Sequence, residues 1–260
     1  MGARLVEPTL EQVLAFCAAE PIERVFLEDA ARRGTGHFTG VQRDGRFTAL
    51  LHAGANLVPS GEGCAAFAAV AASGQARMIL GEERAVSELW RALRERLGAP
   101  REDRPGQPVY ALERPPPAGN TGLRAATRED VELLLPACAA AHEEELGINP
   151  LEREPEAFRW RTEAQVDERR SWLWREDGTI LFKAEASAWT PKAVQLQQVW
   201  VDPHVRNRGY GKRGLADLCR LLLARTPAVC LFARRENAAA IRVYEAVGMR
   251  RVLTYRSVLL

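Results

Sequence analysis

The residues with the clearest chemical potential form a short basic, glycine-bearing run in the C-terminal half of the chain. An apolar segment expected to be a strand precedes the run and an amphipathic segment expected to be a helix follows it; the run reads Arg206, Asn207, Arg208, Gly209, Tyr210, Gly211 and Lys212. Unpaired backbone N–H groups and the macrodipole favour an anion at a helix N-terminus. Glycine also lets a ligand approach the main chain without a Cβ in the way. The run therefore predicts a phosphate-binding loop, better suited to a diphosphate than to a carboxylate.

The same glycines fit two other phosphate-binding patterns less well. Gly209-x-Gly211-x-x-Gly214 matches the dinucleotide-binding fingerprint, but that fold needs further β-α-β units and only 46 of the 260 residues follow Gly214. A P-loop needs Ser or Thr after its lysine, whereas Arg213 follows Lys212. An ordinary glycine-rich turn between a strand and a helix is the plain structural alternative.

The surrounding pattern supplies elements that would position this run. Alternating apolar residues between turns indicate strands, and apolar residues at three- and four-residue spacing indicate helices. In chain order we expect a helix, three strands, a helix, a strand, a helix and a strand, over residues of about 127–145, 172–175, 179–188, 193–201, 215–222, 228–233, 237–247 and 252–259. This half is therefore mixed α/β.

Two signatures on these elements resemble those of the GNAT superfamily of acyltransferases. Residues 197–201, Asp202-Pro203 and Arg206-x-x-Gly209-x-Gly211 are similar to its acetyl-CoA motif, in which Gln or Arg precedes two spaced small residues. Downstream, Asn237-x-x-Ala240-x-x-x-Tyr244-Glu245-x-Val247-Gly248-Met249 is similar to its second signature. The resemblance covers about residues 122–260. It implies a mixed, splayed sheet flanked by helices, whose fourth and fifth strands part to admit the cofactor.

The resemblance also implies a chemistry: acetyl-CoA, or another acyl-CoA, gives its acyl group to a primary amine that attacks the thioester directly. Main-chain groups of Val199 and Val201 would pair with the pantetheine arm. Tyr244 would be the acid that protonates the departing thiolate, a core-packing aromatic being the alternative. The residues implied to bind the cofactor are Val199, Trp200, Val201, Arg206, Asn207, Arg208, Gly209, Tyr210, Gly211, Lys212, Asn237 and Ala240.

The general base is less clear from the residues. An amine must lose its proton before it attacks, so a carboxylate, a histidine or ordered water is needed near the parted strands. Many GNAT enzymes place a Glu in the fourth strand, but here that stretch reads Gln195-Leu196-Gln197-Gln198. Glu185 in the preceding strand and Glu144, in the acidic run after the first helix, are the catalytic candidates. The alternative for each is a solvated surface carboxylate.

A proline- and glycine-rich segment, residues 114–122, separates two expected domains. We expect an N-terminal α/β domain over residues 1–118 and an acyltransferase domain over residues 122–260. Short segments of the first half, among them residues 54–59, expected to be a loop, are similar to a poorly characterised domain that precedes GNAT domains. By analogy it is interpreted as a candidate degenerate GNAT-like half. Since residues 1–120 contain no Arg-x-x-Gly-x-Gly, one cofactor site is expected.

The composition argues against several classes of partner. Its 36 basic and 34 acidic residues are interspersed and give a net charge of +2, so nucleic acid is not expected. No stretch approaches the ~20 apolar residues of a membrane span, and we expect a cytoplasmic protein without a membrane partner. The five cysteines lack C-x-x-C spacing, so neither a metal nor disulfides are expected.

Two further functions stand beside N-acetyl transfer. A non-catalytic acyl-CoA-binding regulatory module is favoured by the missing strand acid, whereas it has no need of a phenol at Tyr244. A nicotinamide-dependent oxidoreductase fits only if the glycine run is a dinucleotide loop. The amine acceptor, whether a small molecule, a peptide or a protein, stays open, as do the acyl-chain length and the oligomeric state.

Overall fold

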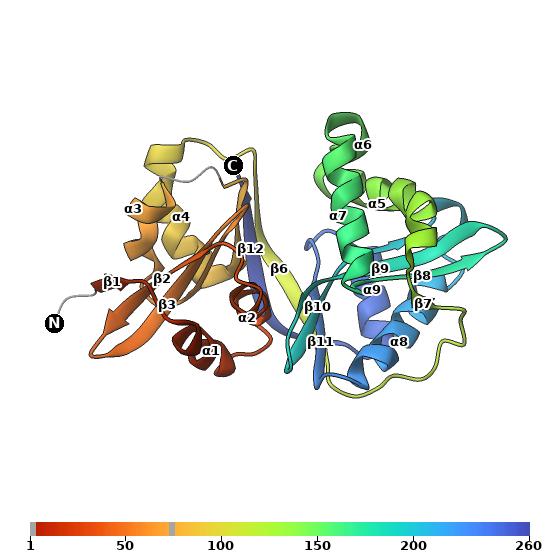
Figure 1. Cartoon of the computed structure of the whole chain (residues 1–260), viewed down its shortest axis with the longest axis horizontal. Coiled ribbons are helices and arrows are strands. Elements are labelled where there is room, and N and C mark those ends of the chain that lie inside the picture. Colours follow the sequence, from red (N-terminus) through yellow and green to blue (C-terminus); the bar gives the residue numbers. More distant parts are fainter. Residues whose placement is uncertain (1–3, 73–75) are drawn as a thin grey trace. The chain divides into compact units, whose positions relative to one another are not determined.

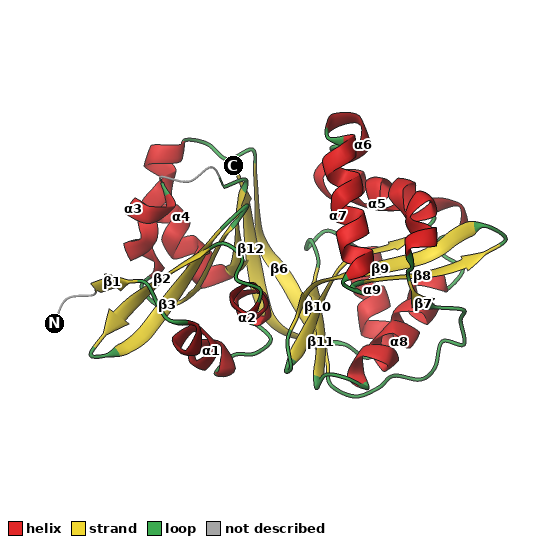
Figure 2. Cartoon of the chain, viewed as in Figure 1, coloured by secondary structure: helices red, strands yellow, loops and turns green. Residues whose placement is uncertain are grey.

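The chain folds into two compact units. The computed structural model describes residues 4–72 and 76–260; residues 1–3 and 73–75 of the expected first domain lie outside the described residues. Unit 1 comprises Met1–Ala111, Phe232–Ala238 and Arg251–Leu260, and unit 2 comprises Leu112–Leu231 and Ala239–Arg250. Each unit is a mixed sheet with helices on both faces (Figures 1 and 2). The expected fold class, a mixed sheet flanked by helices, is confirmed.

The described residues run through one order of elements twice: strand, helical pair, three strands, helix, strand, helix, strand. The first run consists of β1 (Arg4–Val6), α1 (Leu10–Ala18), α2 (Val25–Arg32), β2 (His37–Arg43), β3 (Arg46–Ala53), β4 (Leu57–Gly61), η1 (Cys64–Phe67) with α3 (Ala68–Ala71), β5 (Met78–Glu82), α4 (Glu83–Leu97) and β6 (Glu102–Leu112). The second consists of β7 (Arg124–Ala125), η2 (Arg128–Asp130) with α5 (Val131–Leu146), α6 (Pro150–Arg153) with α7 (Pro155–Asp167), β8 (Ser171–Glu176), β9 (Thr179–Trp189), β10 (Ala193–Val201), η3 (Pro203–Val205), α8 (Tyr210–Leu223), β11 (Ala228–Phe232), α9 (Ala238–Val247) and β12 (Arg250–Leu259). The repeated order indicates two copies of one fold.

Unit 1 has the sheet order β1-β2-β3-β4-β5-β12-β6. Its C-terminal strand β12 pairs antiparallel with β5, placing Tyr255 opposite Glu82. Successive residues of β3 serve opposite faces: Leu50 packs with the α1 and α2 side, whereas Leu51 packs with the η1, α3 and α4 side. Helices α1 and α2 therefore cover one face of this sheet, and α3 and α4 cover the other (Figure 1).

One expectation for unit 1 is wrong. Residues 54–59 were expected to form a loop, yet Leu57–Gly61 is strand β4 and pairs along β3. The misleading residue is Pro59, which cannot donate to a strand ladder. It is tolerated because the pairing recorded between β4 and β5 is confined to Leu57 opposite Ile79, so Pro59 needs no N–H on that side.

Unit 2 has the sheet order β11-β10-β9-β8-β7. Helices α5, α6 and α7 lie on one face, and α8 and α9 lie on the other (Figure 1). Leu134 and Leu135 of α5 pack against Leu173 and Ile180 of the sheet. On the opposite face, a Cβ on Gly214 of α8 would lie 2.5 Å from the Phe182 ring, so only glycine allows this helix to approach β9. The three expected strands and the helix after the basic run are confirmed as β8, β9, β10 and α8.

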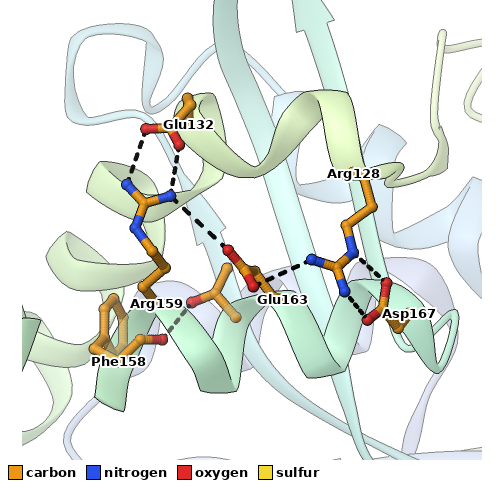
Figure 3. Close-up of polar contacts among 7 residues, drawn as sticks. Arg128, Glu132, Phe158, Arg159, Glu163 and Asp167 are labelled. Carbon is orange, nitrogen blue, oxygen red and sulfur yellow. Dashed lines mark hydrogen bonds and ion pairs between the residues drawn. The ribbon is translucent and has the colours of Figure 1, made fainter. Parts of the chain in front are cut away.

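Helix α7 was not among the expected elements because it buries only a narrow face, Phe158, Thr162 and Val166. Ion pairs fix it instead to the start of α5 (Figure 3). Arg159 donates to both oxygens of Glu132 at 2.5 and 3.1 Å. Arg128 donates to Glu163 at 3.1 Å and also pairs with Asp167. Exposed pairs of this kind each contribute about 0–1 kcal/mol, so the network orients the helix more than it stabilises it.

None of the helices in residues 4–72 and 76–260 combines the length and apolar character needed to cross a membrane.

Candidate functional site

The basic run forms the turn between β10 and α8, and we call residues 206–209 the motif loop. Asp202 first caps η3 by accepting the N–H of His204 at 2.8 Å. Asn207 and Gly209 then adopt left-handed conformations, with φ of +63° and +83°, and Gly209 is the N-cap of α8. Among the described side chains none caps this helix. The first N–H groups of α8 therefore keep their capacity to bind an anion from outside.

The positively charged side chains of this run and of the first turn of α8 differ in their contacts. Arg206 points back from the loop: its Nη2 donates to Glu144 Oε1 at 2.6 Å and its Nε to the Val201 carbonyl at 3.1 Å. Arg213 is held away by the carbonyls of Gly119 and Asn120 at 2.9 and 2.8 Å. Side-chain partners are not recorded for Arg208 or Lys212 within the described residues, so these two supply the available positive charge.

Arg208 and Lys212 are both exposed. Tyr210 instead packs its ring on Trp174, 5.0 Å between centroids, so its contribution to a phosphate site is restricted to the main chain. The N-terminus of α8 thus has no side-chain cap among the described residues, and two exposed cations, Arg208 and Lys212, lie close to it in the chain.

Strands β10 and β11 part beside this loop. The parallel ladder recorded between them covers Ala193 to Gln195 of β10, opposite Ala228 to Cys230, whereas β10 continues to Val201. A bulge lies just beyond the parting point, because Gln198 and Val199 together face a single β9 residue. Gln198 has φ of +48°, an unusual conformation for a residue other than glycine. The half-buried Val199 and Val201 follow on the unpaired stretch, as the splayed sheet requires.

A buried ionic cluster holds this bulge. Lys183 of β9 is 0% exposed, and its Nζ donates to Glu185 Oε1 at 2.7 Å, to Cys138 Sγ at 2.9 Å and to Gln198 Oε1 at 2.8 Å. All three ammonium hydrogens are thereby used. Burial opposes the charge of Lys183, but the Glu185 carboxylate and Cys138 outweigh it and raise the pKa of this ammonium. The cluster ties α5, β9 and the strained residue of β10 together.

The two acids expected as catalytic candidates have different surroundings. Glu144, at the end of α5, accepts from Trp200 Nε1 at 3.3 Å as well as from Arg206. Glu185 is buried within the ionic cluster, and its Oε1 also accepts from the Cys138 thiol at 3.2 Å. Its other oxygen, Oε2, is approached by Gln197 Nε2 at 3.4 Å. Gln197 and Glu185 are register partners next to the point where β10 leaves β11.

Tyr244 lies on α9 and is buried. Burial, followed by the nearby charge of Glu145, raises the pKa of this phenol well above its ordinary value. A phenol in this state stays protonated through the neutral range. Ala240 lies in the first turn of the same helix, and Asn237 directly precedes it in a turn closed by its own N–H to the Arg234 carbonyl at 3.0 Å.

Unit 1 has a corresponding turn between β4 and η1. Gly63, with φ of +89°, is the N-cap there, as Gly209 is for α8. Glu88 of α4 accepts the N–H groups of Gly63 and Cys64 at 3.0 and 2.9 Å through the same oxygen. An internal carboxylate therefore occupies the anion position of this helix N-terminus.

Sequence reasoning missed Lys183, Cys138 and Gln198, which the fold brings together from three elements. A lysine within the otherwise apolar stretch of β9 was the one available signal, since a lysine is almost never fully buried unless it is paired.

Two known protein families match successive parts of the chain. Residues 36–134 match the family model described as a domain of unknown function (DUF4081), and residues 135–249 match that of the acetyltransferase (GNAT) family. The C-terminal part of the chain is therefore similar to the GNAT acetyltransferase family, and the part before it is similar to DUF4081. Both parts of the resemblance seen in the sequence are confirmed. The search of curated proteins gave no match.

Solved GNAT structures resemble the chain over its whole length. An acetyltransferase of the GNAT family from Colwellia psychrerythraea has a TM-score of 0.62 at 11% identity, covering 100% of both chains. A GCN5-related N-acetyltransferase from Sphaerobacter thermophilus has 0.60 at 19%, covering 98% of this chain and 94% of that one. A tandem GNAT protein from the clavulanic acid pathway has 0.57 at 16%, covering 99% and 98%. At these identities the likeness is one of fold, and it extends to both units.

Proposed function

We propose that unit 2 is an acyl-CoA-dependent N-acyltransferase that moves an acetyl group from acetyl-CoA to the primary amine of an acceptor. The observation that carries the proposal is the uncapped N-terminus of α8 beside the unpaired stretch of β10. The family match of residues 135–249 supports acyl transfer in general. We further propose that the acyl donor is acetyl-CoA and that the acceptor is a primary amine.

The cofactor would lie along the parted strand. The backbone N–H groups from Arg206 to Lys212 would hold its pyrophosphate, with Arg208 and Lys212 adding positive charge at the rim. Main-chain groups of Val199, Trp200 and Val201 would pair with the pantetheine arm, because β11 leaves them unpaired. Asn237 and Ala240, at the start of α9, would lie toward the thioester.

The reaction needs two proton movements. The acceptor amine, once neutral, attacks the thioester carbonyl carbon, a C–N bond forms, and the C–S bond breaks to release coenzyme A as a thiolate. Tyr244 would give its phenolic proton to that sulfur. The raised pKa of Tyr244 suits this task, because the phenol is protonated when the thiolate forms.

Glu185 is the acid we assign to accept the amine's proton, directly or through water, because the contact to its Oε2 among the described residues is a long one, 3.4 Å from Gln197, beside the parting point. Glu144, by contrast, would be a positioning residue, since its Oε1 holds Arg206 and Trp200. The two roles differ in their expected effect: Glu185→Gln should lower kcat and change its pH profile, whereas Glu144→Gln should mainly raise the KM for acetyl-CoA.

The deciding experiment is calorimetric titration with acetyl-CoA, followed by a thiol-release assay over a panel of amines, for the native protein and Tyr244→Phe. We expect one saturable site in both proteins and a kcat lower by roughly a hundredfold in the variant, which is within the range for a lost general acid. Binding without turnover on any amine would support the regulatory-module alternative. Absence of binding would overturn the assignment of the cofactor.

A further inference from the structure

Unit 2 contains a second candidate site at the opposite end of α8 from the motif loop. A cavity of about 480 Å³, open to solvent, lies between β7, the start of β8, the end of β9 and the last turn of α8. That volume lies within the range of small-molecule pockets. Since α8 has 14 residues at a rise of 1.5 Å each, the cavity lies roughly 20 Å from the motif loop. It is separate from the site already described.

The walls of the cavity are aromatic and aliphatic. Trp172 and Trp189 contribute their rings, with centroids 5.9 Å apart and planes inclined by 41°. Leu221 of α8 also lines the cavity although it is 47% exposed, whereas Leu215, Leu218 and Leu222 of the same helix are buried. Two inclined indoles and an exposed leucine form a surface that fits a planar apolar group.

The charged side chains that line the cavity are all positive. Arg124, Arg169 and Arg225 line it, and no acidic residue does so within the described part of the chain. Arg124 is already neutralised, because its two terminal nitrogens donate to the two oxygens of Asp130 at 2.6 and 2.8 Å. Arg169 and Arg225 have no side-chain hydrogen bond or ion pair recorded in residues 4–72 and 76–260, and both are exposed.

Acidic residues close to Arg169 in the chain are paired with other arginines, and Glu168 pairs with Arg170 at 3.2 Å. Asp167, two residues before Arg169, is paired with Arg128, as Figure 3 shows. Arg128 also binds Glu163, so both of these carboxylates in the C-terminal half of α7 are paired within this network. The cavity therefore joins apolar walls to two guanidinium groups that pair with no carboxylate of the described residues.

We propose that this cavity binds a small aromatic carboxylate. The planar group would lie against Trp172 and Trp189, and the carboxylate would accept hydrogen bonds from Arg169 and Arg225, which suit planar oxyanions. The positive charge disfavours an amine, so the cavity is distinct in chemistry from an amine-acceptor site. The proposal does not depend on the proposed acyl transfer.

The test uses indole-3-acetate as the probe, with indole-3-acetamide as its uncharged match. Indole N–H signals of the protein are followed by NMR, and those of Trp172 and Trp189 are assigned with single Trp→Phe variants. We expect indole-3-acetate to shift these two signals saturably and the acetamide to bind at least about tenfold more weakly, because a charge-assisted contact is lost. Saturating acetyl-CoA should leave the titration unchanged.

A double variant, Arg169→Gln with Arg225→Gln, should weaken the acid at least about tenfold and leave the weak binding of the amide as it was. Arg175→Gln is the matched control, since Arg175 is an exposed arginine of β8 that does not line the cavity. Equal affinity for acid and amide, an unchanged double variant, or displacement by acetyl-CoA would each overturn the proposal. So would no shift at up to about 10 mM acid.

Discussion

The two units begin an equivalent helix in opposite ways. In unit 2 the N-terminus of α8 follows a left-handed Gly209 and has no side-chain cap among the described residues. In unit 1 the N-terminus of η1 follows a left-handed Gly63, and Glu88 fills it by accepting two backbone N–H groups. The same fold therefore presents one open and one occupied anion position.

The difference lies in the second helix after each turn, which is α9 in unit 2 and α4 in unit 1. Val243 lies at the same position of α9, counted from the first helical residue, as Glu88 does in α4. A Cβ on Gly211, in the first turn of α8, would lie 3.7 Å from the Val243 side chain. An apolar residue in unit 2 thus stands where unit 1 supplies a carboxylate. We therefore expect the residue at this helix position to influence whether the turn can bind an external anion.

The largest effect is expected from moving the carboxylate of unit 1 into unit 2. In Val243→Glu, the new charge would face the phosphate position of α8, and like charges a few ångströms apart near a protein surface cost about 3 kcal/mol. Acetyl-CoA affinity should fall roughly a hundredfold by calorimetry. Val243→Gln is the control of equal size without the charge. Equal losses in both variants would make the effect steric, and no loss would remove α8 as the anion site.

A smaller effect is expected from the two glycines that cap these turns. Valine is poorly tolerated at φ of +83°, the conformation of Gly209, and the strain is on the order of 1–3 kcal/mol. Gly209→Val should therefore lower acetyl-CoA affinity about tenfold, because the loop must rearrange. Gly63→Val, at φ of +89°, introduces strain of the same order into unit 1. It should therefore lower the denaturation midpoint and leave the acetyl-CoA affinity unchanged. Equal losses of acetyl-CoA affinity in Gly209→Val and Gly63→Val would show that backbone strain in either unit disturbs the cofactor site.

The occupied turn should matter for stability and not for cofactor binding. Glu88→Ala leaves the N–H groups of Gly63 and Cys64 without their acceptor, which costs about 1–3 kcal/mol where water cannot replace it. The urea midpoint should fall while acetyl-CoA affinity stays constant. Glu95→Ala, an exposed acid on the same helix, is the control. A change in acetyl-CoA affinity in Glu88→Ala alone would contradict the assignment of the cofactor to unit 2.

Local signals explain what the sequence predicted well. The glycines before α8 and the alternation in β8 to β10 each depend on residues close in the chain, and the structure confirms those elements. Helix α7 lacks a wide apolar face, and the strand β4 contains Pro59, so local patterns failed for both.

Contacts between distant segments could not be predicted from one sequence. The ionic cluster joins Cys138 of α5, Lys183 of β9 and Gln198 of β10, residues whose spacing carries no periodic signal. The pairing of β12 with β5 joins the chain's C-terminal strand to its first half. Glu88 likewise reads as one more exposed acid of an amphipathic helix until the fold places it over Gly63 and Cys64. For these residues the tertiary partner, which the sequence does not name, decides the role.

The smallest effect expected is a change in the reactivity of Cys64, the first residue of η1. A helix N-terminus ordinarily lowers a thiol pKa, but burial, followed by the charge of Glu88, raises the pKa of Cys64 to about 12. Only the thiolate reacts, so labelling should be slow at pH 8 and the rate should rise with pH. Removing the Glu88 charge should lower this pKa and speed labelling by a disulfide reagent severalfold.

The other four thiols provide the internal reference, because burial raises the pKa of Cys17, Cys138, Cys219 and Cys230 to about 12 as well. Mass spectrometry of the labelled protein should find the gain in Glu88→Ala at Cys64 alone, and none in Glu95→Ala. A gain spread over all five thiols would mean that the variant opens by unfolding. An unchanged rate at Cys64 would mean that burial alone protects this thiol, and the electrostatic half of the comparison between the two helix N-termini would then fail.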